Sequence, residues 1–182
     1  MLHVLRTCEA FIPELDLVAE VDDKIVGNIV YTKAKIACDD GIERGVLSFG
    51  PLSVLPEYWG MGIGSELIRH TLELAKAADH KGVLIYGDAS YYHKFGFVPA
   101  ERFGIGTAED MYLESLQALE LSDGALEGCS GRFFEDAAYD VDPNAAEAFD
   151  KTFPAKELRD DLPSQKRFRD LVRMRRPREM MS

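Results

Sequence analysis

Hydrophobic residues near the start of the chain gather in two segments, 17–20 and 24–35, which are rich in residues that favour β-strands. Between them lies Asp22-Asp23, a pair that favours turns, so we expect a β-hairpin. A polar stretch punctuated by glycine follows. It predicts a second turn and then a third strand at about 46–55.

The hydrophobic spacing becomes helical from Gly64 onward. Pro56 ends the preceding strand, because proline cannot donate a hydrogen bond to a neighbouring strand. Residues 83–86, VLIY, are continuously apolar and indicate a short strand covered on both faces. A strand, a helix and a strand in this order predict a right-handed parallel crossover. The face of the helix that we expect to be buried consists of Leu67, Ile68, Thr71, Leu72, Ala75 and Ala78.

The second half of the chain has weaker patterns. We expect strands around 116–121 and 131–135, separated by a loop that contains Gly124 and Gly128. Apolar residues at helical spacing predict a helix within the last twenty residues, where basic side chains are concentrated. A solvated face of a packed helix explains these charges better than a binding function does. They are Lys166, Arg167, Arg169, Arg173, Arg175, Arg176 and Arg178.

Composition limits the classes of function. At 182 residues the chain has room for one domain with a hydrophobic core. Its net charge of −11 argues against nucleic-acid binding, and no apolar run approaches the roughly 20 residues that cross a bilayer. The three cysteines and four histidines are scattered without the spacing of a metal site. We therefore expect a cytoplasmic protein without a metal.

A glycine-rich loop lies between the third strand and the helix. It consists of Trp59, Gly60, Met61, Gly62, Ile63, Gly64 and Ser65. The start of a helix leaves backbone N–H groups unpaired and carries partial positive charge. Because alternate residues of the loop lack a Cβ, a phosphate can approach these N–H groups closely. The loop is therefore predicted to hold a pyrophosphate without a lysine or a metal.

Three alternative interpretations of this loop fit its sequence less well. A Walker loop would end in Lys-Ser or Lys-Thr, whereas this loop ends in Gly-Ser-Glu. A dinucleotide loop has the spacing G-x-G-x-x-G, whereas the spacing here is G-x-G-x-G. Asp88 closely follows the strand at 83–86, so a nucleotide-binding oxidoreductase survives as an alternative. A tight turn that is merely rich in glycine is the third interpretation.

Two separated stretches together resemble a known family. The sequence FGPLSVLPEYWGMGIGSELI, followed by VLIYGDASYYHKFGFVPA, is similar to the core of the GNAT-type N-acetyltransferase superfamily. That family's loop reads Arg/Gln-x-x-Gly-x-Gly/Ala. Gly62 and Gly64 match this pattern, while Trp59 stands at the Arg/Gln position and departs from it. The close match covers about 50 residues, and a looser match covers about 120.

The resemblance implies an α/β (α+β) fold: a mixed, mostly antiparallel sheet with flanking helices and a parallel pair of strands that splays at the cofactor site. It implies one domain over 1–182, with a core at 17–135 and a C-terminal extension at 136–182. The strand Leu52-Ser53-Val54 would pair with the pantetheine arm of acetyl-CoA, and the glycine loop would bind its pyrophosphate.

The resemblance also gives Tyr92 a role. This tyrosine would protonate the coenzyme A thiolate when the tetrahedral intermediate collapses, which a phenol can do because it is protonated at neutral pH. Tyr91 is expected to be structural. No general base is visible: Glu57, Asp88 and Glu114 are conceivable, but each is more often a solvated carboxylate.

The implied function is transfer of an acetyl group from acetyl-CoA to a primary amine by direct attack. The family fold begins with a strand and two helices that wall the acceptor site, whereas this chain reaches its hairpin by residue 17. The alternative is therefore a catalytically impaired module that binds acetyl-CoA or acts by association. A short N-terminus would also leave a sheet edge unprotected, which favours a homodimer. The acidic composition favours cationic acceptors.

Overall fold

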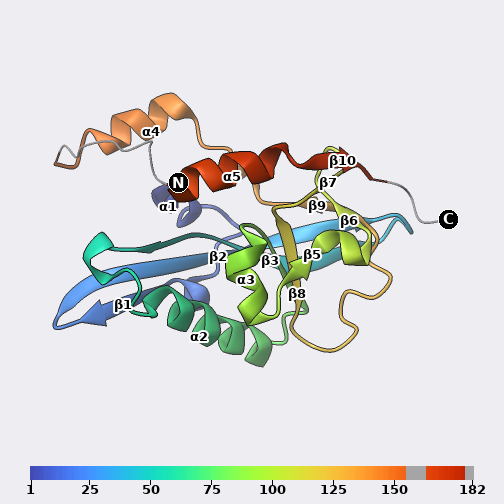
Figure 1. The fold of residues 1–182 in the computed structure, drawn as a ribbon, viewed down its shortest axis with the longest axis horizontal. Coiled ribbons are helices and arrows are strands. Elements are labelled where there is room, and N and C mark those ends of the chain that lie inside the picture. Colours follow the sequence, from blue (N-terminus) through green and yellow to red (C-terminus); the bar gives the residue numbers. More distant parts are fainter. Residues whose placement is uncertain (155–162, 179–182) are drawn as a thin grey trace.

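A curved mixed sheet forms the centre of the protein (Figure 1). The computed structural model describes residues 1–154 and 163–178. Neighbouring strands follow the order β5-β8-β4-β3-β2-β9-β6, and β1 pairs with β2. The strands are β1 (Leu17–Val21), β2 (Lys24–Cys38), β3 (Glu43–Val54), β4 (Gly82–Tyr86), β5 (Val98–Pro99), β6 (Ile105–Gly106), β8 (Leu116–Glu120) and β9 (Gly131–Phe134). A separate two-stranded sheet consists of β7 (Met111–Leu113) and β10 (Arg175–Pro177).

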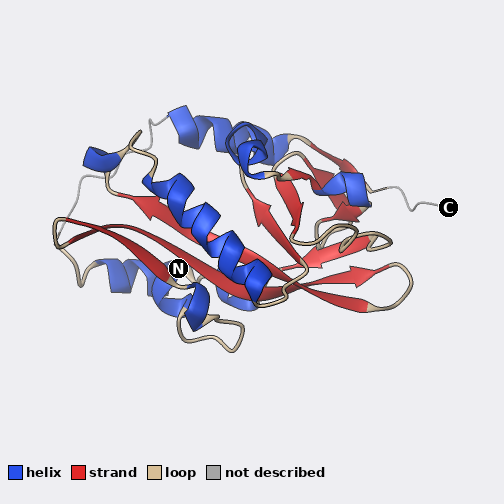
Figure 2. Ribbon diagram, turned by 90° about the horizontal axis from the view of Figure 1, so that it is seen from below, coloured by secondary structure: helices blue, strands red, loops and turns tan. Residues whose placement is uncertain are grey.

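Helices lie on both sides of this sheet (Figure 1). The α-helices are α1 (Leu2–Leu5), α2 (Ile63–Ala77), α3 (Ala89–Tyr92), α4 (Pro143–Asp150) and α5 (Pro163–Arg173). Short 3₁₀ helices connect them: η1 (Pro13–Leu15), η2 (Pro56–Tyr58), η3 (His93–Phe95), η4 (Ala100–Phe103) and η5 (Ala137–Tyr139). Figure 2 shows α2 lying across one face of the strands, and α4 and α5 lie on the opposite side of the sheet.

The elements predicted from hydrophobic spacing are confirmed. Strands β1 and β2 form the expected antiparallel hairpin. Its turn residues Asp22 and Asp23 have φ angles of 48° and 59°, which aspartate tolerates better than most residues. The predicted helix is α2, and five of the six residues expected on its inner face are buried; Ala78 follows the helix as its C-cap and is exposed.

Strands β3 and β4 form the parallel pair, and they separate almost at once. The single register position between them is Leu47↔Val83. On the other side of β3, Ile29 pairs with Leu52 and Tyr31 with Phe49, so β3 has one more residue than β2 between these pairs. Such a bulge bends the strand. Beyond this point β3 continues to Val54 with no strand of the described chain beside it on the β4 side.

Two hydrophobic cores fill the two faces of the sheet. The side chains of Ile29, Tyr31 and Leu47 face α2, which contributes Ile68 among others. Alternate residues of the same strands, such as Ile36 and Val46, form the second core with Leu84 and Phe133. This alternation follows from the pleat of a β-strand.

The C-terminal segment is held to the second face of the sheet. The expected terminal helix is α5, in which Leu171 is buried while Lys166 and Arg167 are exposed. The side chain of Phe168, which contributed to this prediction, lies outside the described residues. After α5, strand β10 pairs with β7. The sequence patterns did not predict α4, β10 or the short strands β5, β6 and β7.

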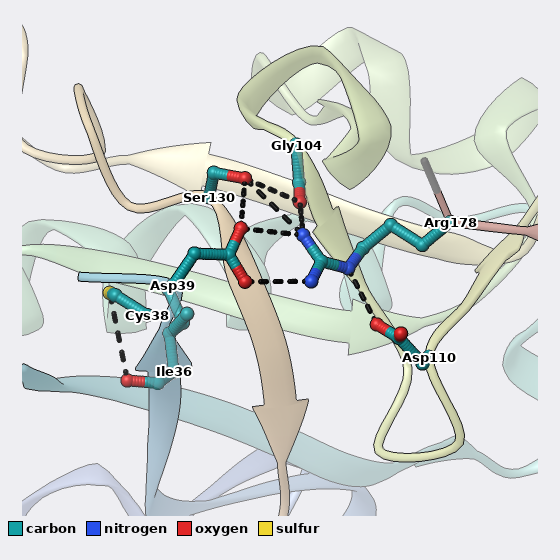
Figure 3. Close-up of polar contacts among 7 residues, drawn as sticks. All are labelled: Ile36, Cys38, Asp39, Gly104, Asp110, Ser130 and Arg178. Carbon is teal, nitrogen blue, oxygen red and sulfur yellow. Dashed lines mark hydrogen bonds and ion pairs between the residues drawn. The ribbon is translucent and has the colours of Figure 1, made fainter. Parts of the chain in front are cut away.

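Arg178 fixes the end of this segment (Figure 3). Its guanidinium donates two hydrogen bonds to Asp39, at 2.7 and 2.8 Å, and one to Asp110 at 2.7 Å. Longer hydrogen bonds reach the carbonyl of Gly104 and the hydroxyl of Ser130. The Arg178 side chain is 3% exposed. This ion-pair cluster connects the C-terminal segment to the loops at one end of the sheet.

Candidate active site

The glycine loop follows η2 and leads directly into α2. Gly60 and Gly62 have φ angles of 77° and 86°, a conformation that disfavours residues with a Cβ. Gly62 is the N-cap of α2, and no side chain caps this helix start. Among the described residues no acceptor is found for the N–H groups of Ile63 and Gly64, the first two residues of α2. These donors are available for an anion, as the sequence predicts.

A cavity of about 590 Å³ opens over this loop. Eight of the ten residues predicted to bind the cofactor line it: Leu52, Val54, Trp59, Gly60, Gly62, Ile63, Gly64 and Ser65. The side chain of Ser53 instead donates a hydrogen bond to Asn28 on β2. Met61 is 66% exposed and does not line the cavity. The structure thus brings the end of β3 and the loop together on one surface.

Three further residues line this cavity without having been predicted: Tyr58, Tyr91 and Lys94. The Lys94 ammonium lies 3.1 Å from the Ser65 hydroxyl and 4.1 Å from the centre of the Tyr91 ring. A cation therefore stands at the loop, although the loop itself contains none. No local pattern marks Lys94, because it approaches Ser65 from 29 residues along the chain.

The exposed edge of β3 lies beside the loop. Because β4 has already separated, the backbone of β3 after Phe49 has no strand partner on that side among the described residues. The Trp59 indole N–H donates to the Val54 carbonyl at 2.7 Å. Trp59 thus orients the end of β3 through its ring nitrogen, and one lone pair of that carbonyl remains available.

Tyr92 is the last residue of helix α3 and borders a second cavity, of about 540 Å³. Its ring packs on Phe49 and Phe97, with centroid distances of 5.9 and 5.7 Å. A Cβ at Gly87 would overlap the ring, so glycine is required there. Burial raises the pKa of Tyr92 to about 12. The phenol is therefore protonated at neutral pH, as the role predicted for it requires.

The two cavities share one lining residue, Tyr91. Its hydroxyl oxygen would lie 3.3 Å from a Cβ on Gly64, so it sits directly at the start of α2. Gln165 and Arg167 of α5 also line the second cavity. A third cavity, of about 440 Å³, also runs under this helix and shares Tyr86 with the second.

The three carboxylates considered as a general base have other surroundings. Glu57 forms an exposed ion pair with Lys24 at 2.9 Å. Asp88 caps α3 through the N–H of Ser90 and pairs with Arg167 at 3.1 Å. Burial alone would raise the pKa of Asp88, but these hydrogen bonds hold it below its ordinary value. Glu114 lines none of the cavities described above.

Sequence reasoning did not single out Glu135. It follows β9, and its Oε1 accepts a hydrogen bond from the buried hydroxyl of Ser48 at 2.8 Å. Burial raises the pKa of this carboxyl group. A lone Glu after a strand carries no signal that distinguishes it from a solvated residue, because its burial depends on strands that are distant in the sequence.

Metal-binding clusters and membrane-spanning helices are absent from the described part of the chain. No group of three or more His, Cys, Asp or Glu side chains there could hold a metal ion. Within the same residues, no helix has both the length and the apolar character that crossing a membrane requires.

Comparison with known proteins gives consistent similarities. The acetyltransferase (GNAT) domain family matches residues 14–99. The chain is 39% identical over 88 residues to the uncharacterized N-acetyltransferase YjhQ of Escherichia coli, a match that spans 48% of each protein. It therefore covers about half the length of that relative. Identity to the uncharacterized N-acetyltransferase YhbS of the same species is 26% over 132 residues, or 72% of this chain and 76% of YhbS.

Two solved structures are similar in fold. A GNAT family acetyltransferase from Brucella melitensis, solved in complex with acetyl-CoA, is 31% identical, with a TM-score of 0.58. The alignment covers 76% of this chain and 75% of that one. E. coli YhbS in complex with CoA has a TM-score of 0.67 at 23% identity, over 77% of this chain and 76% of that one.

Proposed function

Because the chain belongs to the GNAT family of acetyltransferases, we propose that it transfers an acetyl group from acetyl-CoA to a primary amine by direct attack. The observation that carries this proposal is that two neighbouring cavities share Tyr91 in their lining. One cavity contains the loop N–H groups and Lys94, and the other contains Tyr92. A cofactor bound in the first cavity can therefore present its thioester to the second. The Brucella relative, solved with acetyl-CoA, supports the choice of cofactor.

The proposed cofactor site uses three parts of the chain. The loop N–H groups and Lys94 neutralise the pyrophosphate, because hydrogen bonds from charged or dipolar donors to phosphate are strong. The unpaired edge of β3, at Leu52 and Val54, pairs with the amides of the pantetheine arm. Apolar side chains between α2 and β3 exclude water from the arm.

The acceptor side lies under α5 in this proposal. The amine nitrogen attacks the thioester carbonyl and forms a tetrahedral intermediate. As the carbon–sulfur bond breaks, Tyr92 donates its proton to the leaving sulfur. In the proposal, helix α5 contributes to the acceptor wall, because Gln165 and Arg167 line the same cavity as Tyr92.

The binding half of the proposal is tested by unfolding the protein with and without acetyl-CoA. At about a hundred times its dissociation constant, acetyl-CoA should raise the free energy of unfolding by about 2.7 kcal/mol. The Lys94→Met variant should show a smaller rise at the same concentration. Lys81→Met is the matched control, because Lys81 pairs with Asp79 on the surface away from the loop. Stabilisation by NAD in place of acetyl-CoA would contradict the proposal.

The catalytic half is tested by thiol release from acetyl-CoA with spermidine, free lysine and a lysine-containing peptide. Release that depends on an added amine, with acetylated amine as the product, is the expected result. If acetyl-CoA stabilises the protein but no amine causes thiol release, the alternative is favoured: a module that binds acetyl-CoA without turnover.

A further inference from the structure

The position of the reacting thioester follows from the two ends of the proposed cofactor site. The pyrophosphate loop lies beyond the C-terminal end of β3, so an arm that pairs with β3 runs back from Val54 toward Gly50. At that level Tyr92 packs against Phe49. Here β3 also carries its bulge and has lost β4 as a partner. The thioester therefore lies near Gly50.

A polar cluster occupies the other face of the sheet at this level. Ser48 and Thr32, opposite each other on β3 and β2, are both 0% exposed. The Tyr139 hydroxyl lies 3.3 Å from both the Thr32 hydroxyl and the Gly50 carbonyl. Glu135 accepts the hydrogen bond from Ser48. Since β-strand residues rise about 3.3 Å each, Ser48 and Gly50 are about 7 Å apart along the strand. The hydroxyl that holds the Glu135 carboxylate thus belongs to a residue two positions along β3 from Gly50.

The surroundings of Glu135 differ from those of the other candidate bases. Glu57 and Asp88 are paired with cations, whereas Glu135 accepts its hydrogen bond from a neutral hydroxyl. The groups that face it are Tyr86 from β4 and Tyr139 from η5, whose phenols it makes less acidic. The charged residues that line the same outer cavity as Glu135 are Glu9, Lys33, Lys35 and Asp136. A carboxylate that is partly buried and only weakly paired is a better proton acceptor near neutral pH than a fully ionised surface carboxylate.

We infer that Glu135 accepts the proton that the attacking amine loses. This inference rests on the proposed function. The nitrogen forms a bond to the carbonyl carbon while one of its protons passes to Glu135, directly or through one water molecule. The carbon–sulfur bond then breaks and the sulfur takes the Tyr92 proton. Proton exchange with solvent returns Glu135 and Tyr92 to their starting states, so the sum is amide and free thiol.

The pH dependence of turnover tests this assignment on an amine that the wild type acetylates. The Glu135→Gln variant should lose about a hundredfold or more in kcat near neutral pH, the size typical of a general base. It should also lose the acidic limb of the wild-type pH profile. Affinity for acetyl-CoA should not change, because Glu135 does not line the loop cavity. That affinity also shows that the variant is folded.

Ser48→Ala gives a second readout, the position of the acidic limb. This position would not change if Glu135 had a merely structural role. The Ser48 hydroxyl stabilises the charged form of Glu135, so its removal should shift the acidic limb to higher pH while turnover above that limb persists. Glu9→Gln is the matched control. Glu9 lines the same outer cavity as Glu135, but it is exposed, and the variant should keep the wild-type profile.

The outcomes separate the inference from the proposed function. An unchanged acidic limb in Glu135→Gln overturns the inference and leaves amine acetylation standing. Equal losses in Glu135→Gln and Glu9→Gln overturn it too, because they would reflect general electrostatics. A wild-type protein that binds acetyl-CoA but acetylates none of the three amines overturns the proposed function and, with it, the inference.

Discussion

Two adjacent tyrosines differ in what they face. Tyr91 and Tyr92 follow each other in the short helix α3, and successive residues of a helix point in different directions. The Tyr91 hydroxyl therefore reaches Gly64 and the loop cavity, while the Tyr92 ring packs on Gly87 and Phe49. We predicted Tyr91 to be structural, and the structure places it in the lining of the loop cavity.

This difference predicts that removing the two hydroxyl groups affects different kinetic constants. Tyr92→Phe should lower kcat by about a hundredfold without weakening acetyl-CoA binding, because the phenol acts only as the thiolate leaves. Tyr91→Phe should raise KM for acetyl-CoA and leave kcat nearly unchanged. Steady-state kinetics with acetyl-CoA as the varied substrate measures both, and equal effects on kcat would contradict the assignment.

The pH profile of the wild type adds to this prediction. Because burial raises the pKa of Tyr92 to about 12, the phenol keeps its proton throughout the neutral and mildly basic range. A pKa near 12 leaves about 99% of the phenol protonated at pH 10. Loss of the Tyr92 proton should therefore cause no fall in the rate of the wild type below about pH 10. A limb near pH 8 that disappears in the variant would refute the proposed environment of Tyr92.

At the scale of elements, the sequence predicts those helices and strands whose formation depends on a local hydrophobic pattern. Strands β1 to β4 and helix α2 have hydrophobic runs or periods of their own, so their positions could be predicted. Strands β5 and β6 have two residues each, and they exist only because β8 and β9 lie beside them. The same limit applies to the site. The glycine loop is local in sequence, whereas Lys94 reaches this loop and Glu135 reaches Ser48 on β3 only through the tertiary fold.

The C-terminal segment is the element whose role depends most on distant contacts. Arg178 pairs with Asp39, 139 residues away, and with Asp110. Arg176, in β10 just before Arg178, pairs with Glu101, but both of these side chains are exposed. A buried guanidinium that satisfies two carboxylates should hold β10, and with it α5, far more firmly than a surface pair does.

Arg178→Met should therefore destabilise the protein by about 1–3 kcal/mol, since two carboxylates lose a charged hydrogen-bond partner but keep access to water. Arg176→Met, the matched control, should cost less than about 1 kcal/mol. Denaturant unfolding measures both. Hydrogen exchange should be faster across α5 and β10 in Arg178→Met. Equal losses of stability in the two variants would show that Arg178 is not the anchor.

The Arg178 pair also predicts a pH dependence. The hydrogen bonds from Arg178 lower the pKa of Asp39 in the folded state. The stability that this pair contributes is then present above the ordinary aspartate pKa of about 4 and is lost as the pH falls through the lower, folded value. Wild type and Arg178→Met should thus converge in stability as the solution is acidified, whereas a constant difference would contradict this linkage.

At the scale of the whole molecule, charge is unevenly distributed. The chain carries −11 overall, yet seven basic residues lie between 166 and 178 and Lys94 stands at the loop. A long-range negative potential attracts cations and repels anions, and it is screened by salt with a Debye length of about 10 Å at 0.1 M. In the proposed function, Lys94 acts on bound acetyl-CoA at short range, where salt screens less.

Salt should therefore affect the two substrates of the proposed reaction in opposite directions. The kcat/KM for spermidine should fall as ionic strength rises from about 0.01 to 0.2 M, on the order of tenfold, because screening removes the attraction of a polycation to an acidic protein. The kcat/KM for acetyl-CoA, an anion, should rise or stay level over the same range. Ethylamine, with a single charge, is the control and should show a smaller fall than spermidine. If spermidine and ethylamine respond equally, the net charge does not steer the acceptor, and the local groups under α5 must select it instead.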